Sequence, residues 1–441
     1  MGRANVFYRI IMTASFFISA NSFLLLRDNL RLIPAAIFLF LIPNIFCGLG
    51  GKDVRGARLK ICSHGAWCLV IFAVSAVLSA VLQIIMLFYT LPNLKLTLLN
   101  LLFCFAAHFL LFWNGIISVY CTSVQLGIRR RVVGALCGLI PIANLFVLRN
   151  IIKVTLDEVS FEAEKDRINR SREHLRVCAT RYPILLVHGV FFRDYKYVCY
   201  WGRIPAQLIK NGAQVYYGNH QSALSVADSA KELSARIREI TDKSGCGKVN
   251  IIAHSKGGLD CRRALQDPET ARRVASLTTI NTPHRGCGFA DYLLSEIPLS
   301  VQNRIAAAYN GAARRLGDTS PDFMAAVRDL TSAGCAQPDI QMQAPVGVYC
   351  QSVGSVLRRA SHGKFPLNLS YRFVRHFDGA NDGLVSVQSF EWGSKYILLQ
   401  PSGARGISHG DVVDLNRENI PGFDVREFYV RLVSDLKARG L

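Results

Sequence analysis

The segment Val249-Asn250-Ile251-Ile252-Ala253-His254-Ser255-Lys256-Gly257-Gly258 places one serine between a short apolar run and two glycines. The run from Val249 to Ile252 is mostly β-branched, which predicts a strand covered on both faces and followed by a sharp turn into a helix. Such a turn exposes the serine hydroxyl at its apex, where free N–H groups of the helix also point. The segment therefore predicts a nucleophile at Ser255, with the backbone N–H of Lys256 as a donor to a developing oxyanion.

A serine hydroxyl is a weak nucleophile, so it needs a histidine to take its proton and a carboxylate to orient that histidine. In α/β-hydrolases the three residues occur in the order serine, acid, histidine. Asp382 is the preferred acid, because it precedes a glycine and a short apolar run, as in a loop at a strand end. Asp378 is the competing acid. His409 is the candidate base, because it follows a strand-like segment at 396–399.

The other histidines of this region have weaker claims to the role of base. His362 and His376 both precede the acid, which is the wrong order. His188 ends the first expected strand of the domain, where the loop can supply a second oxyanion donor, the N–H of Val190. We expect the His188 side chain to be structural, and His284 to support the loops of the site.

The first third of the chain is far more apolar than the rest. Residues 61–94 and 96–128 contain no Asp, Glu, Lys or Arg, and each run exceeds the ~20 residues needed to cross a bilayer. Residues 32–51 form a third uncharged run, and 10–26 and 132–148 are shorter ones. We expect residues 1–150 to form a transmembrane bundle of four or five helices, and the protein to lie in the cell membrane.

The charges between these runs predict the orientation of the bundle. Arginines and lysines gather before the run at 10–26, after the run at 32–51 and after the run at 96–128. By the positive-inside rule this distribution places the N-terminus in the cytoplasm. The side occupied by the rest of the chain then depends on 132–148, which Gly138, Pro141 and Asn144 interrupt. A full crossing would place the following domain outside, and a surface or re-entrant helix would leave it in the cytoplasm.

Beyond the bundle, 151–181 is highly charged and suits a solvated helical linker. From Tyr182 short apolar runs alternate with helix-like segments, which predicts a mostly parallel sheet flanked by helices over 182–441.

Five motifs of this region occur in the order found in bacterial triacylglycerol lipases of the α/β-hydrolase superfamily, which the chain resembles. They are His188-Gly189, Ala253-His254-Ser255-Lys256-Gly257, Thr282-Pro283-His284-Arg285-Gly286, Asn381-Asp382-Gly383-Leu384-Val385 and His409 with Asp411. Ala253 stands where the G-x-S-x-G pattern has a glycine. The resemblance implies Ser255 as nucleophile, Asp382 as acid, His409 as base, and Val190 and Lys256 as oxyanion donors. It also implies a mobile lid at about 293–332.

The resemblance also suggests a calcium ion near the active-site histidine, and Asp411 matches one ligand position. Leu415 stands where a further oxygen would be expected, so we predict no metal there. Seven cysteines after the bundle form no C-x-x-C pair and predict neither disulfides nor zinc. No cofactor is expected.

The net charge of +20 comes without a nucleic-acid motif, and it fits anionic lipid head groups better. We therefore expect a membrane-anchored serine hydrolase that cleaves carboxylic esters of lipids. The alternatives are a phospholipase or an acyltransferase with the same residues, and a non-catalytic membrane scaffold or lipid sensor. The sequence does not indicate an oligomeric state.

Overall fold

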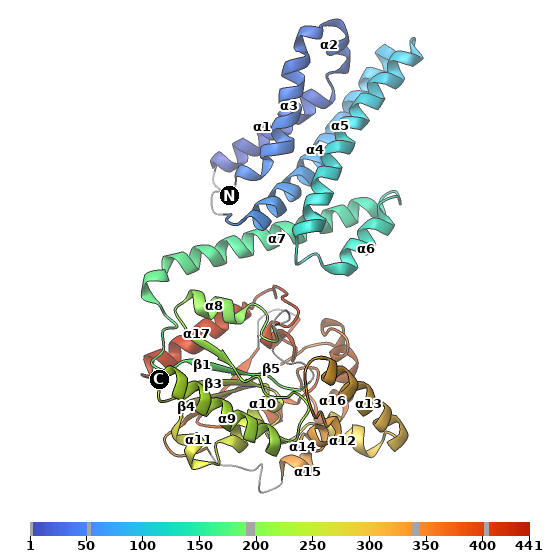
Figure 1. Ribbon diagram of the computed structural model, residues 1–441. Helices are drawn as coiled ribbons and strands as arrows, with labels where there is room; N and C mark the ends of the chain where they lie inside the picture. The colour runs from blue at the N-terminus through green and yellow to red at the C-terminus, as the bar shows by residue number, and fades with distance from the viewer. Residues whose placement is uncertain (1–2, 51–53, 191–198, 337–343, 401–404) are drawn as a thin grey trace. The chain divides into compact units, whose positions relative to one another are not determined.

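The computed structural model describes residues 3–50, 54–190, 199–336, 344–400 and 405–441 (Figure 1). The chain forms two compact parts, Met1–Ser171 and Arg172–Leu441, and each is described by itself.

The N-terminal part is helical. Its elements are α1 (Arg3–Ala20), α2 (Phe23–Asp28), the 3-10 turn η1 (Leu30–Leu32), α3 (Ile33–Phe46), the 3-10 turn η2 (Cys47–Gly50), α4 (Ala57–Thr90), α5 (Leu94–Thr122), α6 (Gly127–Cys137) and α7 (Ala143–Ser171).

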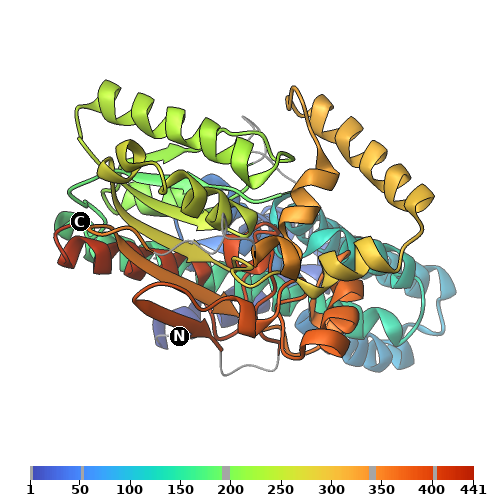
Figure 2. The same ribbon diagram turned by 90° about the horizontal axis from the view of Figure 1, so that it is seen from below.

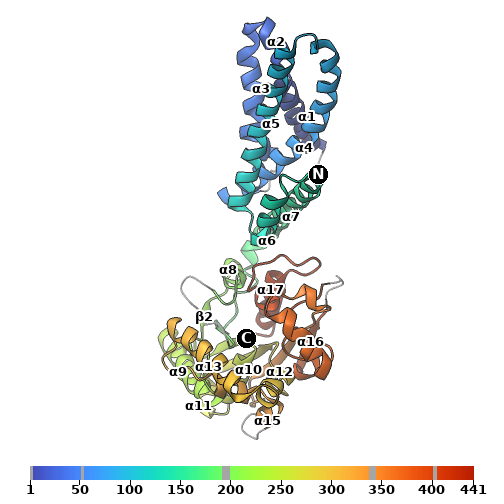
Figure 3. The ribbon, with the colours of Figure 1, turned by 90° about the vertical axis from the view of Figure 1, so that its right-hand side faces the viewer.

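Two antiparallel helix pairs make up the apolar bundle (Figures 1 and 3). The start of α1 lies beside the end of α3, because Tyr8 Oη donates to the Phe46 carbonyl at 2.6 Å. Helices α4 and α5 pack closely through glycine: a Cβ added at Gly65 would lie 2.8 Å from the Gly115 carbonyl oxygen. Small residues at such contacts let helix backbones approach, as in membrane bundles.

Polar side chains join the two pairs inside the bundle. Asn21 donates to Ser79 Oγ at 2.7 Å, Gln83 donates to Asn21 at 3.0 Å, and Asn100 donates to Gln83 at 2.6 Å. This ladder connects α1, α4 and α5, so the first pair is fixed to the second by hydrogen bonds as well as by apolar packing.

The long uncharged runs correspond closely to α4 and α5, which among the residues that the structure describes are the two helices long and apolar enough to cross a membrane. Residues 132–148 do not form one helix. Helix α6 ends at Cys137 and α7 begins at Ala143, and Ile142 between them has a φ of 68°. Pro141 cannot donate a backbone hydrogen bond, which explains the break. Helix α7 then continues to Ser171 through most of the expected linker.

The C-terminal part is a six-stranded, all-parallel sheet in the order β2-β1-β3-β4-β5-β6. The strands are β1 (Ile184–Val187), β2 (Val215–Tyr217), β3 (Val249–His254), β4 (Val274–Ile280), β5 (Tyr349–Ser355) and β6 (Lys395–Leu399). The helices are α8 (Ile204–Lys210), α9 (Val226–Ser244), α10 (Lys256–Ala264), α11 (Pro268–Arg272), α12 (Gly288–Ser295), α13 (Leu299–Arg315), α14 (Phe323–Asp329), α15 (Ser332–Cys335), α16 (Leu367–Asp378) and α17 (Val425–Ala438). Short 3-10 turns are η3 (Glu173–Leu175), η4 (Ala360–His362), η5 (Val387–Ser389) and η6 (Asp411–Val413). The predicted α/β-hydrolase fold, preceded by a helical region, is confirmed.

Helices cover both faces of this sheet (Figure 2). On one face α8 and α17 pack through Leu208 and Val433, with Trp201 just before α8 in the same cluster. On the other face α9 and α10 pack through Leu233 and Cys261. Strands β1, β3 and β4 are buried along their whole length, which explains why apolar residues on them do not alternate strictly with polar ones.

The order of the strands places the site. The chain moves from β1 outward to β2 and then returns to the other side of β1 to form β3. Ligands of open parallel sheets bind where the strand order reverses, at the carboxyl ends of the strands. The loops after β1 and β3 meet there, and they carry Val190 and Ser255.

Candidate active site

Ser255 lies at the turn between β3 and α10 in a backbone conformation that serine rarely adopts. Its φ is 54° and its ψ is −132°. Residues outside the common regions cost about 1–3 kcal/mol and persist only where their surroundings hold them. Its side chain makes no cap hydrogen bond to α10, so the hydroxyl is not used to stabilise the helix.

Neighbouring groups hold this turn on both sides. Ser255 N–H donates to the Ile280 carbonyl at 2.9 Å, and Thr282 Oγ1 donates to the Ser255 carbonyl at 2.8 Å. Gly257 must be small, because an added Cβ would lie 2.3 Å from the His188 carbonyl oxygen. Ala253, the departure from the usual motif, is fully buried within β3.

The structure brings His409 and Asp382 together. His409 Nδ1 lies 2.6 Å from Asp382 Oδ2, and the His409 backbone N–H donates to the Asp382 carbonyl at 2.8 Å. The other carboxylate oxygen accepts from the N–H groups of Leu384 and Val385 at 2.9 and 2.8 Å. Asp382 is completely buried, so these donors replace the water that a carboxylate needs.

Two backbone hydrogen bonds hold the loops that carry Asp382 and His409 against the chain just after β5. Leu357, just beyond β5, donates its N–H to the Asn381 carbonyl at 2.9 Å. Ile407 donates its N–H to the Val356 carbonyl at 2.8 Å. Both loops are therefore tied to the end of β5, although each makes a long excursion before it arrives.

His409 also reaches the serine turn. Its ring packs against the ring of His254, the residue before Ser255, with centroids 4.5 Å apart. Tyr200 Oη holds His254 in place, since it lies 2.6 Å from His254 Nδ1 and accepts from the Gly189 N–H at 3.2 Å. Burial and the nearby His409 lower the pKa of His254 well below its usual value, so its ring is neutral.

The competing residues lie elsewhere. Asp378 is the last residue of α16 and accepts from the Gly288 N–H at 3.1 Å. His362 lies 3.2 Å from the Arg405 carbonyl, and His376 is exposed on α16. None of these contacts involves Ser255, Asp382 or His409.

Val190 and Lys256, the two residues predicted to supply oxyanion donors, lie close to Ser255 along the chain or in space. Lys256 is the first residue of α10, and the first backbone N–H groups of a helix have no acceptor within the helix. Its side chain lies fully buried and pairs with Asp260 at 2.6 Å. Val190 is buried, and Gly189 before it packs against Ser255, since an added Cβ there would lie 2.8 Å from the Ser255 Cβ. Residues 191–198, which follow Val190, lie outside the described residues.

The other two histidines singled out from the sequence have structural surroundings. His188 stacks on His220 with centroids 4.1 Å apart, and burial lowers its pKa to about 3. His284 Nδ1 accepts from Arg262 at 2.9 Å, and its ring stacks on Trp392.

Two residues that support the site were not identified from the sequence. Asn281 Nδ2 donates to Asp382 Oδ2 at 2.6 Å, so it fixes the same oxygen that faces His409. Its position directly after β4 was a signal, because side chains at that edge of a parallel sheet meet. Tyr200, described above, has no comparable signal in its neighbourhood.

A calcium ion does not fit beside His409. The carboxylates of Asp411 and Glu418 both bind one guanidinium: Arg405 Nη2 lies 3.1 Å from Asp411 and 3.0 Å from Glu418. A cation already occupies the place between these acids, and Leu415 contributes no oxygen.

The expected lid corresponds to the end of α12, α13 and α14. Leu294 and Ile297 pack on the core of this region, whereas Leu299, Val301 and Ile305 on α13 are exposed. Helix α13 stands at the rim of the domain (Figure 2).

Comparison with known proteins gives partial likenesses. No protein-family model matches the chain. It is 38% identical over 171 residues to triacylglycerol lipases of Pseudarthrobacter phenanthrenivorans and Burkholderia plantarii, which covers 36% of this chain and 53% and 47% of those proteins. It is 26% identical over 271 residues to triacylglycerol lipase 2 of Saccharomyces cerevisiae, covering 55% of this chain and 74% of that protein. The chain thus spans about half the length of the bacterial relatives.

Solved structures give a weaker likeness. The mature lipase BlEst2 of Bacillus licheniformis has a TM-score of 0.41 at 21% identity, covering 58% of this chain and 92% of that one. The metagenomic carboxyl esterase MGS0156 has a TM-score of 0.43 at 16% identity, covering 58% and 76%.

Proposed function

We propose that this protein is a membrane-anchored serine hydrolase that cleaves carboxylic esters of lipids through an acyl-enzyme. The observation that supports the proposal is the strained turn at Ser255, together with a buried His409–Asp382 pair whose histidine ring packs on His254, the residue before Ser255. A strained serine at a strand-to-helix junction is the nucleophile arrangement of this fold.

In this mechanism the Ser255 hydroxyl attacks the ester carbonyl carbon while His409 Nε2 takes its proton. Asp382 holds His409 so that Nδ1 carries the other proton. The N–H groups of Val190 and Lys256 receive the oxyanion, and His409 returns its proton to the leaving alcohol. Water, deprotonated by His409, then releases the acid and restores Ser255.

A fluorophosphonate probe tests the nucleophile. It should label the wild type at Ser255, located by peptide mass spectrometry, and Ser255→Ala should abolish labelling. His409→Asn should slow labelling strongly, whereas His376→Asn, at an exposed histidine on α16, should leave it unchanged. Folded wild-type protein that is not labelled, or is labelled elsewhere, contradicts the proposal.

Membrane anchoring is supported by what α4 and α5 expose. Both are longer than a bilayer requires, and large apolar side chains on them are open, such as Phe88, Tyr89, Leu102 and Phe105. Exposed apolar surface of this extent is costly in water and is satisfied by lipid. Extraction with carbonate should leave the full chain with the membrane fraction.

The helix pairs also support a cytoplasmic hydrolase domain. Each pair, α1 with α3 and α4 with α5, returns the chain to the side where it started. The 11 residues of α6 span about 16 Å, which is too short for the ~30 Å hydrocarbon core. The domain then lies on the side of the N-terminus, which the arginine distribution places in the cytoplasm.

A membrane-impermeant fluorophosphonate tests this orientation. It should label Ser255 in lysed cells only, while a permeant probe labels both lysed and intact cells. Labelling of intact cells by the impermeant probe would place the domain outside and contradict the proposed orientation, without affecting the proposed chemistry.

The lipid class of the substrate is supported by the named activity of the relatives and by the exposed apolar residues of α13. Extracted membrane lipids and triacylglycerol should therefore release fatty acid with the wild type and not with Ser255→Ala. If only short water-soluble esters are cleaved, the enzyme is an esterase and the lipid assignment fails.

A further inference from the structure

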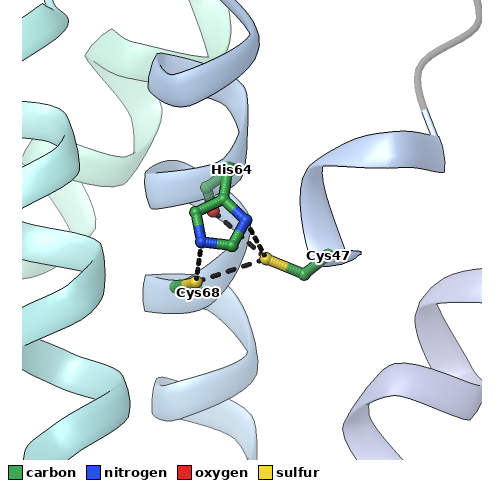
Figure 4. Close-up of side chains that lie close together, drawn as sticks. All are labelled: Cys47, His64 and Cys68. Atoms are coloured by element: carbon green, nitrogen blue, oxygen red, sulfur yellow. Dashed lines mark hydrogen bonds between the residues drawn. The ribbon is translucent and has the colours of Figure 1, made fainter. Parts of the chain in front are cut away.

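A second cluster of reactive side chains lies within the N-terminal bundle, away from the serine hydrolase residues. Cys47 of η2 faces α4, where His64 and Cys68 are one turn apart (Figure 4). Cys47 Sγ lies 3.2 Å from Cys68 Sγ and 3.3 Å from His64 Nδ1, and Cys68 Sγ lies 3.4 Å from His64 Nε2. The three residues can each offer one ligand atom within 4.8 Å of the others.

The two thiols of the cluster are enclosed, His64 is half-buried, and the cluster is held from both sides. Cys47 and Cys68 are completely buried. The backbone of η2 presses on α4, since a Cβ added at Gly48 would lie 2.8 Å from the His64 Cβ. The donors therefore come from two separate elements that the fold keeps in contact, which is the arrangement of a preformed ligand set.

A buried cation adjoins the cluster. Arg9 of α1 donates to the Cys47 carbonyl, and its guanidinium lies over the Trp67 ring at 3.9 Å. Within the described part of the chain Arg9 has no carboxylate partner, and its Nε has no hydrogen-bond acceptor. A buried charge without a counter-charge is costly, so this guanidinium indicates negative charge nearby. Cys47, once its thiol proton is displaced by a bound metal ion, is the group placed to supply it.

We propose that Cys47, His64 and Cys68 bind one thiophilic metal ion, Cu(I), between η2 and α4. Thiolate and imidazole are the ligands that soft and borderline metals select, whereas carboxylate sites suit harder cations. Structural zinc takes four ligands, and the described residues provide three. Two thiolates, one Cu(I) and the Arg9 guanidinium sum to zero charge, whereas Zn(II) would leave the arginine uncompensated.

Binding involves no change of oxidation state. Cu(I) displaces the two thiol protons, which pass to solvent, and forms two bonds to sulfur and one to an imidazole nitrogen. Since the ion joins η2 to α4, its binding should raise the free energy of unfolding of the bundle. The inference does not depend on the proposed ester hydrolysis.

The experiment uses the full chain in detergent, reduced and kept without oxygen, with Cu(I) delivered from a coloured chelator complex. The wild type should withdraw one Cu(I) per chain, and X-ray absorption should show two sulfur ligands and one nitrogen ligand. Cys47→Ser, Cys68→Ser and His64→Gln should each weaken Cu(I) binding by more than ~100-fold, beyond what loss of an outer-shell partner costs.

Cys62→Ser is the matched control, because Cys62 is also completely buried on α4 but lies outside the cluster. It should bind Cu(I) as the wild type does. Fluorophosphonate labelling of Ser255 reports whether the hydrolase domain of each variant is folded, and circular dichroism reports the helices. His64→Gln keeps both cysteines, so it remains informative if a cysteine variant does not fold.

Three results would overturn the proposal. The first is equal Cu(I) binding by the wild type and the cluster variants. The second is a Cys47–Cys68 disulfide in the freshly isolated protein, together with no metal binding by that protein after reduction. The third is a preference of the reduced protein for Zn(II) over Cu(I). The last would refute copper as the ion.

Discussion

The contacts of Asp382 allow the effect of Asp382→Asn to be worked out atom by atom. Oδ1 accepts two backbone N–H groups, those of Leu384 and Val385, so the amide oxygen of an asparagine must take this position. The new NH2 group then occupies the place of Oδ2 and faces two donors, Asn281 Nδ2 and His409 Nδ1. His409 can avoid the clash only by moving its proton from Nδ1 to Nε2.

A histidine with its proton on Nε2 cannot accept one from Ser255. In serine hydrolases the same change of tautomer lowers kcat by about 10⁴. We expect a loss of about 10³–10⁴ here, which is about 4–5.5 kcal/mol of transition-state stabilisation. The fold should persist, because the oxygen at Oδ1 keeps its two backbone donors.

The assay is kcat for a p-nitrophenyl ester, with active enzyme counted by fluorophosphonate titration. Asp378→Asn is the matched control, four positions away at the end of α16, and should retain activity within about threefold, because its contact with the Gly288 N–H does not involve Ser255, Asp382 or His409. An Asp382→Asn enzyme within tenfold of the wild type, or an equal loss in Asp378→Asn, would refute the reasoning.

Three further predictions concern stability. Gly257→Ala places a Cβ 2.3 Å from the His188 carbonyl oxygen and should cost about 1–3 kcal/mol in urea unfolding, with loss of fluorophosphonate labelling; unchanged labelling would contradict the turn geometry. Burial lowers the pKa of His188 to about 3, so below pH ~6.5 the unfolded chain binds a proton that the folded chain does not, and stability should fall with pH from about 6.5 toward 3. His188→Gln should lessen this slope and His376→Gln, at an exposed site, should not; equal slopes for all three proteins would refute the assignment. Arg405→Met removes the cation between the Asp411 and Glu418 carboxylates and should lower the melting temperature of the protein. Addition of EGTA to the wild type should change neither the melting temperature nor the activity. A melting temperature of the wild type that depends on calcium would show that Arg405 does not fill the site.

The serine turn was predictable because its signals are local. A buried strand, a serine and two glycines lie within ten residues, and each constrains the backbone of the next. The strand predictions at 249–252 and 396–399, and the expected first strand that ends at His188, overlap β3, β6 and β1 for the same reason. Strand β2 is three half-buried residues, and β5 contains Gln351, Ser352 and Gly354, so neither has a distinctive apolar pattern.

The position of Asp382 and His409, the proposed partners of Ser255, was harder to predict because it depends on contacts between distant segments. Asp382 follows β5 only after an excursion through α16, and contacts between distant segments bring it back, among them the bond from the Leu357 N–H to the Asn381 carbonyl and the bond from Asn281 to Asp382. The glycine and the short apolar run after Asp382 favoured it over Asp378 but gave no distance to His409. Asn281 and Tyr200 were missed because their roles depend on which side chains they meet.

The cluster in the N-terminal bundle also depends on a contact between separate segments that the sequence does not reveal. His64 and Cys68 form a local i, i+4 pair on α4, which a helical pattern predicts to share a face. Cys47 belongs to the turn after α3 and meets them only because η2 packs on α4. A spacing rule for metal ligands assumes that the loop between donors is short and its geometry standard. Here the connection contains a separate turn and residues 51–53, so tertiary packing, rather than spacing, creates the three-donor set.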